Sequence, residues 1–133
     1  MSREILFRGK RTYNKKWIEG SLVVDYAGNT YIVWEYETVK GAMISSKTIN
    51  VYPETVGEYT GLTDKNGKKI FEGDIVSGYF DHEKIVGYIF YGSDAKFFIQ
   101  RKGLFGIELN NAEDWVEVIG NIHDNPELLE VSE

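Results

Sequence analysis

Carboxylate side chains recur in close groups along the chain, and converging carboxylates are the chemical equipment of metal-dependent nucleases and of glycosidases. The groups are Asp64, Glu72 and Asp74; Asp81 and Glu83; and Glu113, Asp114 and Glu117. The chain has two histidines and no cysteine, so a metal site would have to combine histidine with carboxylates. Neither histidine stands at a recognisable ligand spacing, and neither a nucleophile elbow nor a phosphate-cradling loop is present. We therefore expect a protein that is not an enzyme and that binds no metal and no cofactor.

The densest group of potential site residues is the stretch GEYTGLTDKNGKKIFEGDIV, residues 57–76. Asn66-Gly67 predicts a type I′ hairpin turn, whose two central residues both need positive φ. Asp64 is placed to accept hydrogen bonds from backbone amides at the entrance of that turn. Glu72-Gly73-Asp74 predicts a second bend, with positive φ at Gly73 and the Asp74 carboxylate satisfying nearby amides. These residues are thus expected to serve the fold rather than a reaction.

A basic segment with interleaved aromatic residues lies near the start of the chain, in FRGKRTYNKKW. Cations there could follow a phosphate backbone while aromatic rings stack on bases. The residues concerned are Arg8, Lys10, Arg11, Lys15, Lys16 and Trp17. The net charge of −6 for the whole chain argues against general nucleic-acid binding. Binding of nucleic acid through residues 8–17 is the alternative hypothesis for function.

Charge is distributed unevenly between the two ends of the chain. Residues 1–20 carry six basic and two acidic side chains, whereas residues 104–133 carry eight acidic side chains and no lysine or arginine. Such polarity can steer one end of a molecule toward the opposite end of another. Together with abundant aromatic residues, it favours a protein-interaction or self-assembling module, whose partner is another copy or another protein.

Extended segments must position all of these residues. Apolar and aromatic runs separated by turn residues predict strands throughout residues 4–52 and 57–122, typical of an antiparallel sandwich or small barrel. Gly78 and Gly87 fall inside strand patterns and suggest bulges or sharp coiling. Near the end, Asn125 is expected to cap a short helix that starts at Pro126. We expect one domain, residues 1–133, with a strand region at 1–52 and a barrel-like region at 53–133.

The segments that normally direct a protein to or across a membrane are missing from this sequence. It has neither an apolar signal region at its start nor an apolar run of about 18 residues. With no cysteine available for disulfides, a location in a reducing cytoplasm is expected, without membrane contact.

Three blocks, REILFRGKR, YTGLTDKNGKKIFEGDIV and VIGNIHDNPELLE, together resemble the YopX family of phage and prophage proteins, in family order and over essentially the whole chain. The resemblance implies a mainly β fold like an SH3-like pseudo-barrel with an attached strand region. It also implies a phage or prophage origin and action in a bacterial cytoplasm, where a partner other than a second copy would be a host or phage protein. It implies no particular activity and no catalytic residues. The signature positions, with mainly structural roles, are Tyr59, Gly61, Asp64, Asn66, Gly67, Glu72, Gly73, Asp74, Asn125 and Pro126. Lys15-Lys16 departs from the family pattern, which argues against nucleic-acid binding as a family function.

Overall fold

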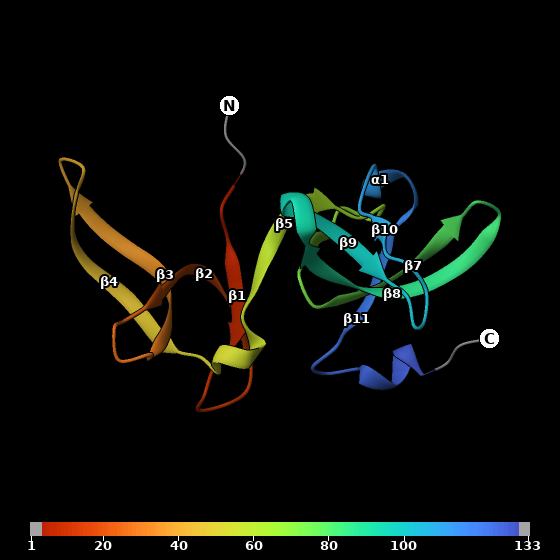
Figure 1. Cartoon of the computed structure of the whole chain (residues 1–133). Coiled ribbons are helices and arrows are strands. Elements are labelled where there is room, and N and C mark those ends of the chain that lie inside the picture. The colour runs from red at the N-terminus through yellow and green to blue at the C-terminus, as the bar shows by residue number, and fades with distance from the viewer. Residues whose placement is uncertain (1–3, 131–133) are drawn as a thin grey trace. The chain divides into compact units, whose positions relative to one another are not determined.

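The computed structural model describes residues 4–130, except for the side chains of residues 36–38 and 43–46. The chain divides into two compact units, residues 1–59 and 60–133, and each is described by itself (Figure 1). The boundary falls inside strand β5, Gly57–Thr63.

The first unit is an antiparallel sheet built from neighbouring hairpins. Its strands are β1 (Phe7–Lys10), β2 (Trp17–Val24), β3 (Thr30–Val39), β4 (Ala42–Asn50) and the start of β5, in the spatial order β4-β3-β2-β1-β5. A single 3₁₀ turn, η1 (Pro53–Thr55), connects β4 to β5. It begins at Pro53 because proline is pre-set for the first helical position and has no amide to leave unsatisfied.

A small core holds the first unit together. Ile18, Ile32 and Val51 are buried, and partly buried apolar side chains pack around them. Gly20 makes this packing possible, because a Cβ there would lie 2.3 Å from the carbonyl oxygen of Val33 on β3. The side chain of Thr55 in η1 accepts a hydrogen bond from the amide of Lys10 at 2.8 Å, which ties η1 to β1.

The second unit contains the remaining elements. They are the end of β5, β6 (Lys69–Phe71), β7 (Asp74–Phe80), β8 (Glu83–Gly92), η2 (Ser93–Ala95), β9 (Lys96–Gln100), β10 (Ile107–Glu108), α1 (Ala112–Trp115), β11 (Glu117–Asn121) and η3 (Pro126–Leu129). Five of these strands form an antiparallel sheet in the order β10-β9-β8-β7-β11, and β6 pairs beside β5. The strongly bent β7–β8 hairpin is visible in green in Figure 1.

The core of the second unit is larger than that of the first. Its buried members lie in or next to β6, β7, β8, β9, β10 and α1 and are Ile70, Val76, Ile85, Ile89, Ile99, Ile107, Leu109, Ala112 and Val116. Ala112 and Val116 are 1% and 0% exposed, so they anchor the two ends of the short helix α1 in this core. The position of Trp115, between these anchors, is thereby fixed.

The turn between β5 and β6 lies where Asn66-Gly67 places it, but the expected type I′ geometry is wrong. Of its residues only Gly67 has positive φ, at 82°. The amide of Gly67 bonds to the carbonyl of Asp64, and the amide of Asp64 bonds to the carbonyl of Lys68. This is the three-residue loop in which a type I turn is followed by one left-handed glycine. Paired positive φ occurs instead at Asp81-His82, in the two-residue β7–β8 turn.

The mainly β fold and the short C-terminal helix predicted from the sequence are confirmed. The described strands form open antiparallel sheets without a closed barrel. The C-terminal helix η3 is of the 3₁₀ type, and Asn125 does not cap it with its side chain. The Asn125 Oδ1 atom instead accepts a hydrogen bond from the amide of Asn121 at 3.2 Å.

The glycines inside the strand patterns have a role other than the expected bulges. Pairing of β7 with β8 runs through Gly78 and Gly87 without a shift of register. A Cβ on Gly87 would lie 2.5 Å from the carbonyl oxygen of Gln100, and one on Gly78 would lie 2.4 Å from that of Trp115. Both glycines therefore permit close approach of neighbouring backbone, and the irregular register occurs in β11, between Val118 and Gly120.

Candidate protein-binding groove

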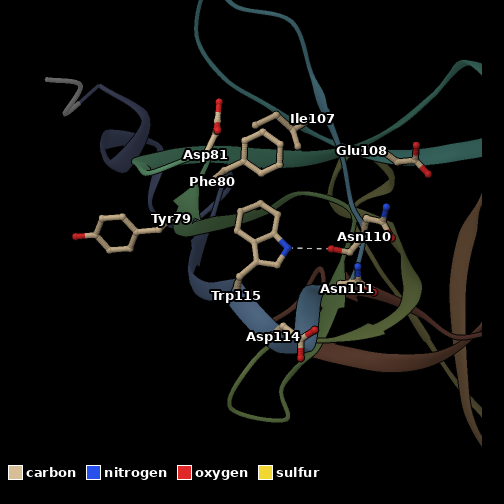
Figure 2. A pocket seen from close by; sticks show the side chains of 9 residues that line it. All are labelled: Tyr79, Phe80, Asp81, Ile107, Glu108, Asn110, Asn111, Asp114 and Trp115. Atoms are coloured by element: carbon tan, nitrogen blue, oxygen red, sulfur yellow. Dashed lines mark hydrogen bonds between the residues drawn. The ribbon is translucent and has the colours of Figure 1, made fainter.

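A groove of about 490 Å³ opens on the second unit beside Trp115, and we call it the Trp115 groove (Figure 2). Aromatic, acidic and amide side chains line it. They are Tyr79, Phe80, Asp81, Ile107, Glu108, Asn110, Asn111, Asp114 and Trp115. The end of β7, the β7–β8 turn, β10, the segment leading into α1 and α1 itself supply these residues.

Local hydrogen bonds hold the indole of Trp115 in place. Its Nε1–H donates to the carbonyl oxygen of Asn110 at 2.9 Å, the dashed line in Figure 2. The left-handed backbone of Asn111, with φ of 50°, reverses the chain so that this carbonyl faces the indole. Leu109 is buried, and its amide bonds to the carbonyl of Phe97, which fixes the start of the same segment. The groove is therefore lined by a ring whose orientation is set before any ligand arrives.

One further aromatic ring, that of Phe80, stands at the mouth of the groove, whereas the ring of Tyr79 points away from Trp115 (Figure 2). Phe80 packs on Trp115 with ring centroids 5.5 Å apart and is 43% exposed, while Tyr79 is 71% exposed. Both precede the β7–β8 turn directly, where the strand extends beyond the core. Two adjacent strand residues point to opposite faces, so the core cannot bury both. Exposed aromatic rings beside a concavity are typical of sites that bind proteins or ligands.

The charge at the groove is entirely negative. Asp81, Glu108 and Asp114 line it, and no lysine or arginine does. Glu108 is partly compensated by the Lys96 ammonium, 3.6 Å away. Asp81 and Asp114 are exposed and make no ion pair within the described part of the chain. Two carboxylates are thus available to a cationic ligand.

The acidic residues of the central stretch serve backbone geometry. The Asp64 carboxylate is buried and accepts amide hydrogen bonds from Asn66, Lys68 and Val118, each at 2.9 Å. Burial alone would raise the pKa of Asp64, but the three amides and the positive charge of Lys68 lower it below its usual value.

The bend that follows is built in a similar way. Asp74 is 1% exposed and accepts the amide of Phe71 at 2.8 Å, while Gly73 has the expected positive φ, 93°. Gly61 also has positive φ, Tyr59 is buried and Glu72 is half-buried. Among the described residues, no group of three or more histidines, aspartates or glutamates could hold a metal ion.

The basic segment forms the turn between β1 and β2 in the first unit. The guanidinium of Arg8 lies 4.6 Å from the ring centroid of Trp17, and the Lys10 ammonium lies 5.5 Å from it. Trp17 is therefore already in cation–π contact within its own sheet, whereas Lys15 and Lys16 are exposed. Arg11 is half-buried, where its backbone bridges to Val51.

The lining aromatic residues Tyr79, Phe80 and Trp115 fall inside sequence patterns that predict strands, and strand patterns alone do not mark them as site residues. One usable signal existed, since two aromatic residues directly precede the turn at Asp81-His82. The indole's place in the groove carried no such signal, because it depends on α1, a helix of four residues that sequence patterns do not predict.

No helix in the described residues is both long and apolar enough to cross a membrane.

A second hollow of about 430 Å³ lies beside Tyr88, Gln100 and Leu129, where Lys102 and Glu130 form an ion pair of 3.9 Å. It lacks the exposed aromatic cluster of the Trp115 groove.

Comparison with known proteins gives the lineage of the chain. The family model described as YopX protein matches residues 6–130. Among solved structures, the crystal structure of protein EF1440 from Enterococcus faecalis is similar, with 31% sequence identity and a TM-score of 0.62. The match covers 96% of this chain and 99% of that one. No curated protein matches. The matched model spans nearly all of the described fold, and the chain belongs to the YopX family.

Proposed function

We propose that this protein is a non-enzymatic protein-interaction module that holds a segment of a partner protein in the Trp115 groove. The observation that carries the proposal is the preformed indole of Trp115, packed against the exposed ring of Phe80. Rigid aromatic side chains contribute strongly to protein interfaces because they bury a large area at low cost in conformational entropy.

The same proposal holds that the protein catalyses no reaction. Asp64 and Asp74, the two buried carboxylates of the central stretch, are used as acceptors for backbone amides. An acceptor that closes a turn is poorly placed to exchange protons with a substrate. The acids of the groove are exposed and separate, which suits recognition of a cation. Family membership supports a phage or prophage origin and action in a bacterial cytoplasm, which we include in the proposal.

Selection from a random peptide library displayed on phage tests the proposal. We expect enriched peptides that combine basic and aromatic residues, because these complement the acidic, aromatic groove. Binding of the selected peptides should move the Trp115 indole N–H signal in the ¹⁵N–¹H spectrum, which a Trp115→Phe variant assigns. Asp114→Lys should weaken the binding by about tenfold or more, because it turns attraction into repulsion.

The neighbouring substitution Glu113→Lys is the matched control. Glu113 carries the same charge and is exposed on the same helix, but it does not line the groove. It should leave peptide binding nearly unchanged. A selection without enrichment, or peptides whose binding is insensitive to Asp114→Lys, would count against the proposed function.

A further inference from the structure

We infer that the Trp115 groove of one copy of the chain receives the β1–β2 hairpin turn, residues 11–16, of a second copy. This inference rests on the proposed function and names its partner. Each copy carries one hairpin turn and one groove, so the contact joins unlike surfaces of two molecules.

The hairpin turn has a defined shape that presents its tip to solvent. The amide of Arg11 bonds to the carbonyl of Lys16 and the amide of Lys15 bonds to the carbonyl of Arg11, both at 2.9 Å. The Asn14 side chain accepts the amide of Lys16 at 3.0 Å. Positive φ at Lys15, 61°, completes the reversal. The turn is therefore ordered before association, which lowers the entropy lost on binding.

The side chains at the tip match the groove in chemistry. Tyr13 is 73% exposed, and Lys15 and Lys16 are exposed on the same turn. No described residue forms an ion pair with either lysine. The tip thus offers one aromatic ring and two ammonium groups.

The groove offers the complementary set. Trp115 and Phe80 form a surface on which the Tyr13 ring can pack, edge or face, as aromatic pairs prefer. Asp81 and Asp114 flank it and attract the lysines. The groove volume of about 490 Å³ lies within the range of about 300–1,000 Å³ usual for ligand sites, enough for a ring and an adjoining side chain.

Charge over the whole stretch favours this pairing over association of like surfaces. Residues 8–17 contain five basic and no acidic side chains, and the groove lining contains three acidic and no basic side chains. Two hairpin turns would repel each other because both are basic, and two grooves would repel each other because both are acidic. A hairpin tip buries less than the roughly 1,200 Å² of stable interfaces, so we expect weak, salt-sensitive association.

Sedimentation equilibrium of the full chain at increasing concentration tests the inference, at low and high salt (roughly 0.05 and 0.5 M). The wild type should associate at low salt and dissociate at high salt. Two variants should each remain monomeric. One, Lys15→Asn/Lys16→Glu, changes the charge of residues 11–16 from +3 to 0, and the other, Asp81→Asn/Asp114→Lys, changes the charge of the groove lining from −3 to 0. Asparagine is used at residues 15 and 81 because it tolerates their positive φ.

Mixing the two variants is the decisive measurement. The hairpin variant retains a native groove and the groove variant retains a native hairpin, so a 1:1 mixture should form heterodimers although neither variant associates alone. Matched controls carry the same charge changes at other exposed residues: Lys40→Asn/Lys102→Glu and Glu83→Gln/Glu113→Lys. Both controls should associate like the wild type, and circular dichroism should show that all four variants are folded.

Three outcomes would overturn the inference. They are a wild type that stays monomeric at every concentration, association that the two charge changes leave intact, and binding of a fluorescent oligothymidylate by a monomeric chain that is lost on Lys15→Asn/Lys16→Glu. The last result would assign the hairpin to nucleic acid. In each case, peptides that still bind the groove in an Asp114-dependent manner would leave the proposed function standing.

Discussion

Asp64 joins parts of the second unit that are far apart in the sequence. Its Oδ1 atom accepts the amides of Asn66 and Lys68 within the β5–β6 turn, and its Oδ2 atom accepts the amide of Val118 on β11. One buried carboxylate thus satisfies three donors that water cannot reach easily. Hydrogen bonds to a charged acceptor are stronger than those between neutral groups.

The substitution Asp64→Asn tests this role. The amide group cannot accept bonds at both of its polar atoms, so at least one backbone donor loses its partner. We expect the free energy of unfolding to fall by about 2–4 kcal/mol. Urea unfolding at pH 7, followed by tryptophan fluorescence, measures the change. Asp114→Asn is the control, because that exposed carboxylate has no comparable partners, and an equal loss in both variants would contradict the assignment.

The pH dependence of the free energy of unfolding also tests the stabilising role of the Asp64 carboxylate. The pKa of Asp64 is lowered in the folded chain, so its contribution is present above the pKa of the unfolded chain, about 3.8, and is lost as pH falls through the folded value. The difference in stability between wild type and Asp64→Asn should therefore be constant near neutral pH and shrink below about pH 4. A difference that grows on acidification would show the opposite linkage.

At the scale of elements, the groove depends on how closely β7 approaches α1. A Cβ on Gly78 would lie 2.4 Å from the carbonyl oxygen of Trp115 and 2.8 Å from its ring. Because the nearest atom is backbone, rotation of a side chain cannot relieve the clash. The helix itself would have to move, and with it the indole that lines the groove.

Gly78→Ala should therefore lower the free energy of unfolding by about 1–3 kcal/mol and displace the Trp115 indole N–H signal. Binding of selected peptides should weaken in parallel. Gly106→Ala is the matched control, since a Cβ there would meet its nearest atom at 3.4 Å, an ordinary contact. Unchanged indole signals in Gly78→Ala would show that α1 does not rest on β7 as described.

An element can be predicted from the sequence when the residues that determine its conformation lie within the element itself. The bend at Gly73 and the turn at Gly67 were predictable because glycine and aspartate encode backbone geometry at their own positions. The type of the turn at Gly67 was not predictable, because the Asp64 carboxylate and its hydrogen bond from the distant Val118 amide help decide it. The Trp115 groove was beyond prediction for a similar reason: it arises where a hairpin end and a four-residue helix meet.

At the scale of the whole molecule, the two proposed contact surfaces lie in different units. The basic hairpin turn belongs to residues 1–59 and the Trp115 groove to residues 60–133. Assembly through them requires that both units be folded in each copy. The relative stability of the units therefore bears directly on function.

The cores of the two units predict that they differ in stability. Among the described residues, three buried apolar side chains form the core cluster of the first unit and nine form that of the second. Burial of apolar surface is the main stabilising term, so the first unit should unfold at lower urea concentration. Tryptophans labelled with ¹⁹F can follow this, because Trp17 and Trp34 report on the first unit and Trp115 on the second.

Matched isoleucine-to-alanine substitutions, one in each core, test whether the two units unfold separately. Ile32 and Ile99 are each 0% exposed, one in each core, and replacement by alanine should cost about 2–5 kcal/mol in the unit concerned. Ile32→Ala should shift the Trp17 and Trp34 transitions to lower urea and leave that of Trp115 nearly in place. Ile99→Ala should shift the Trp115 transition. If all three signals instead moved together in both variants, the units would fold as one cooperative body, because β5 belongs to both of them.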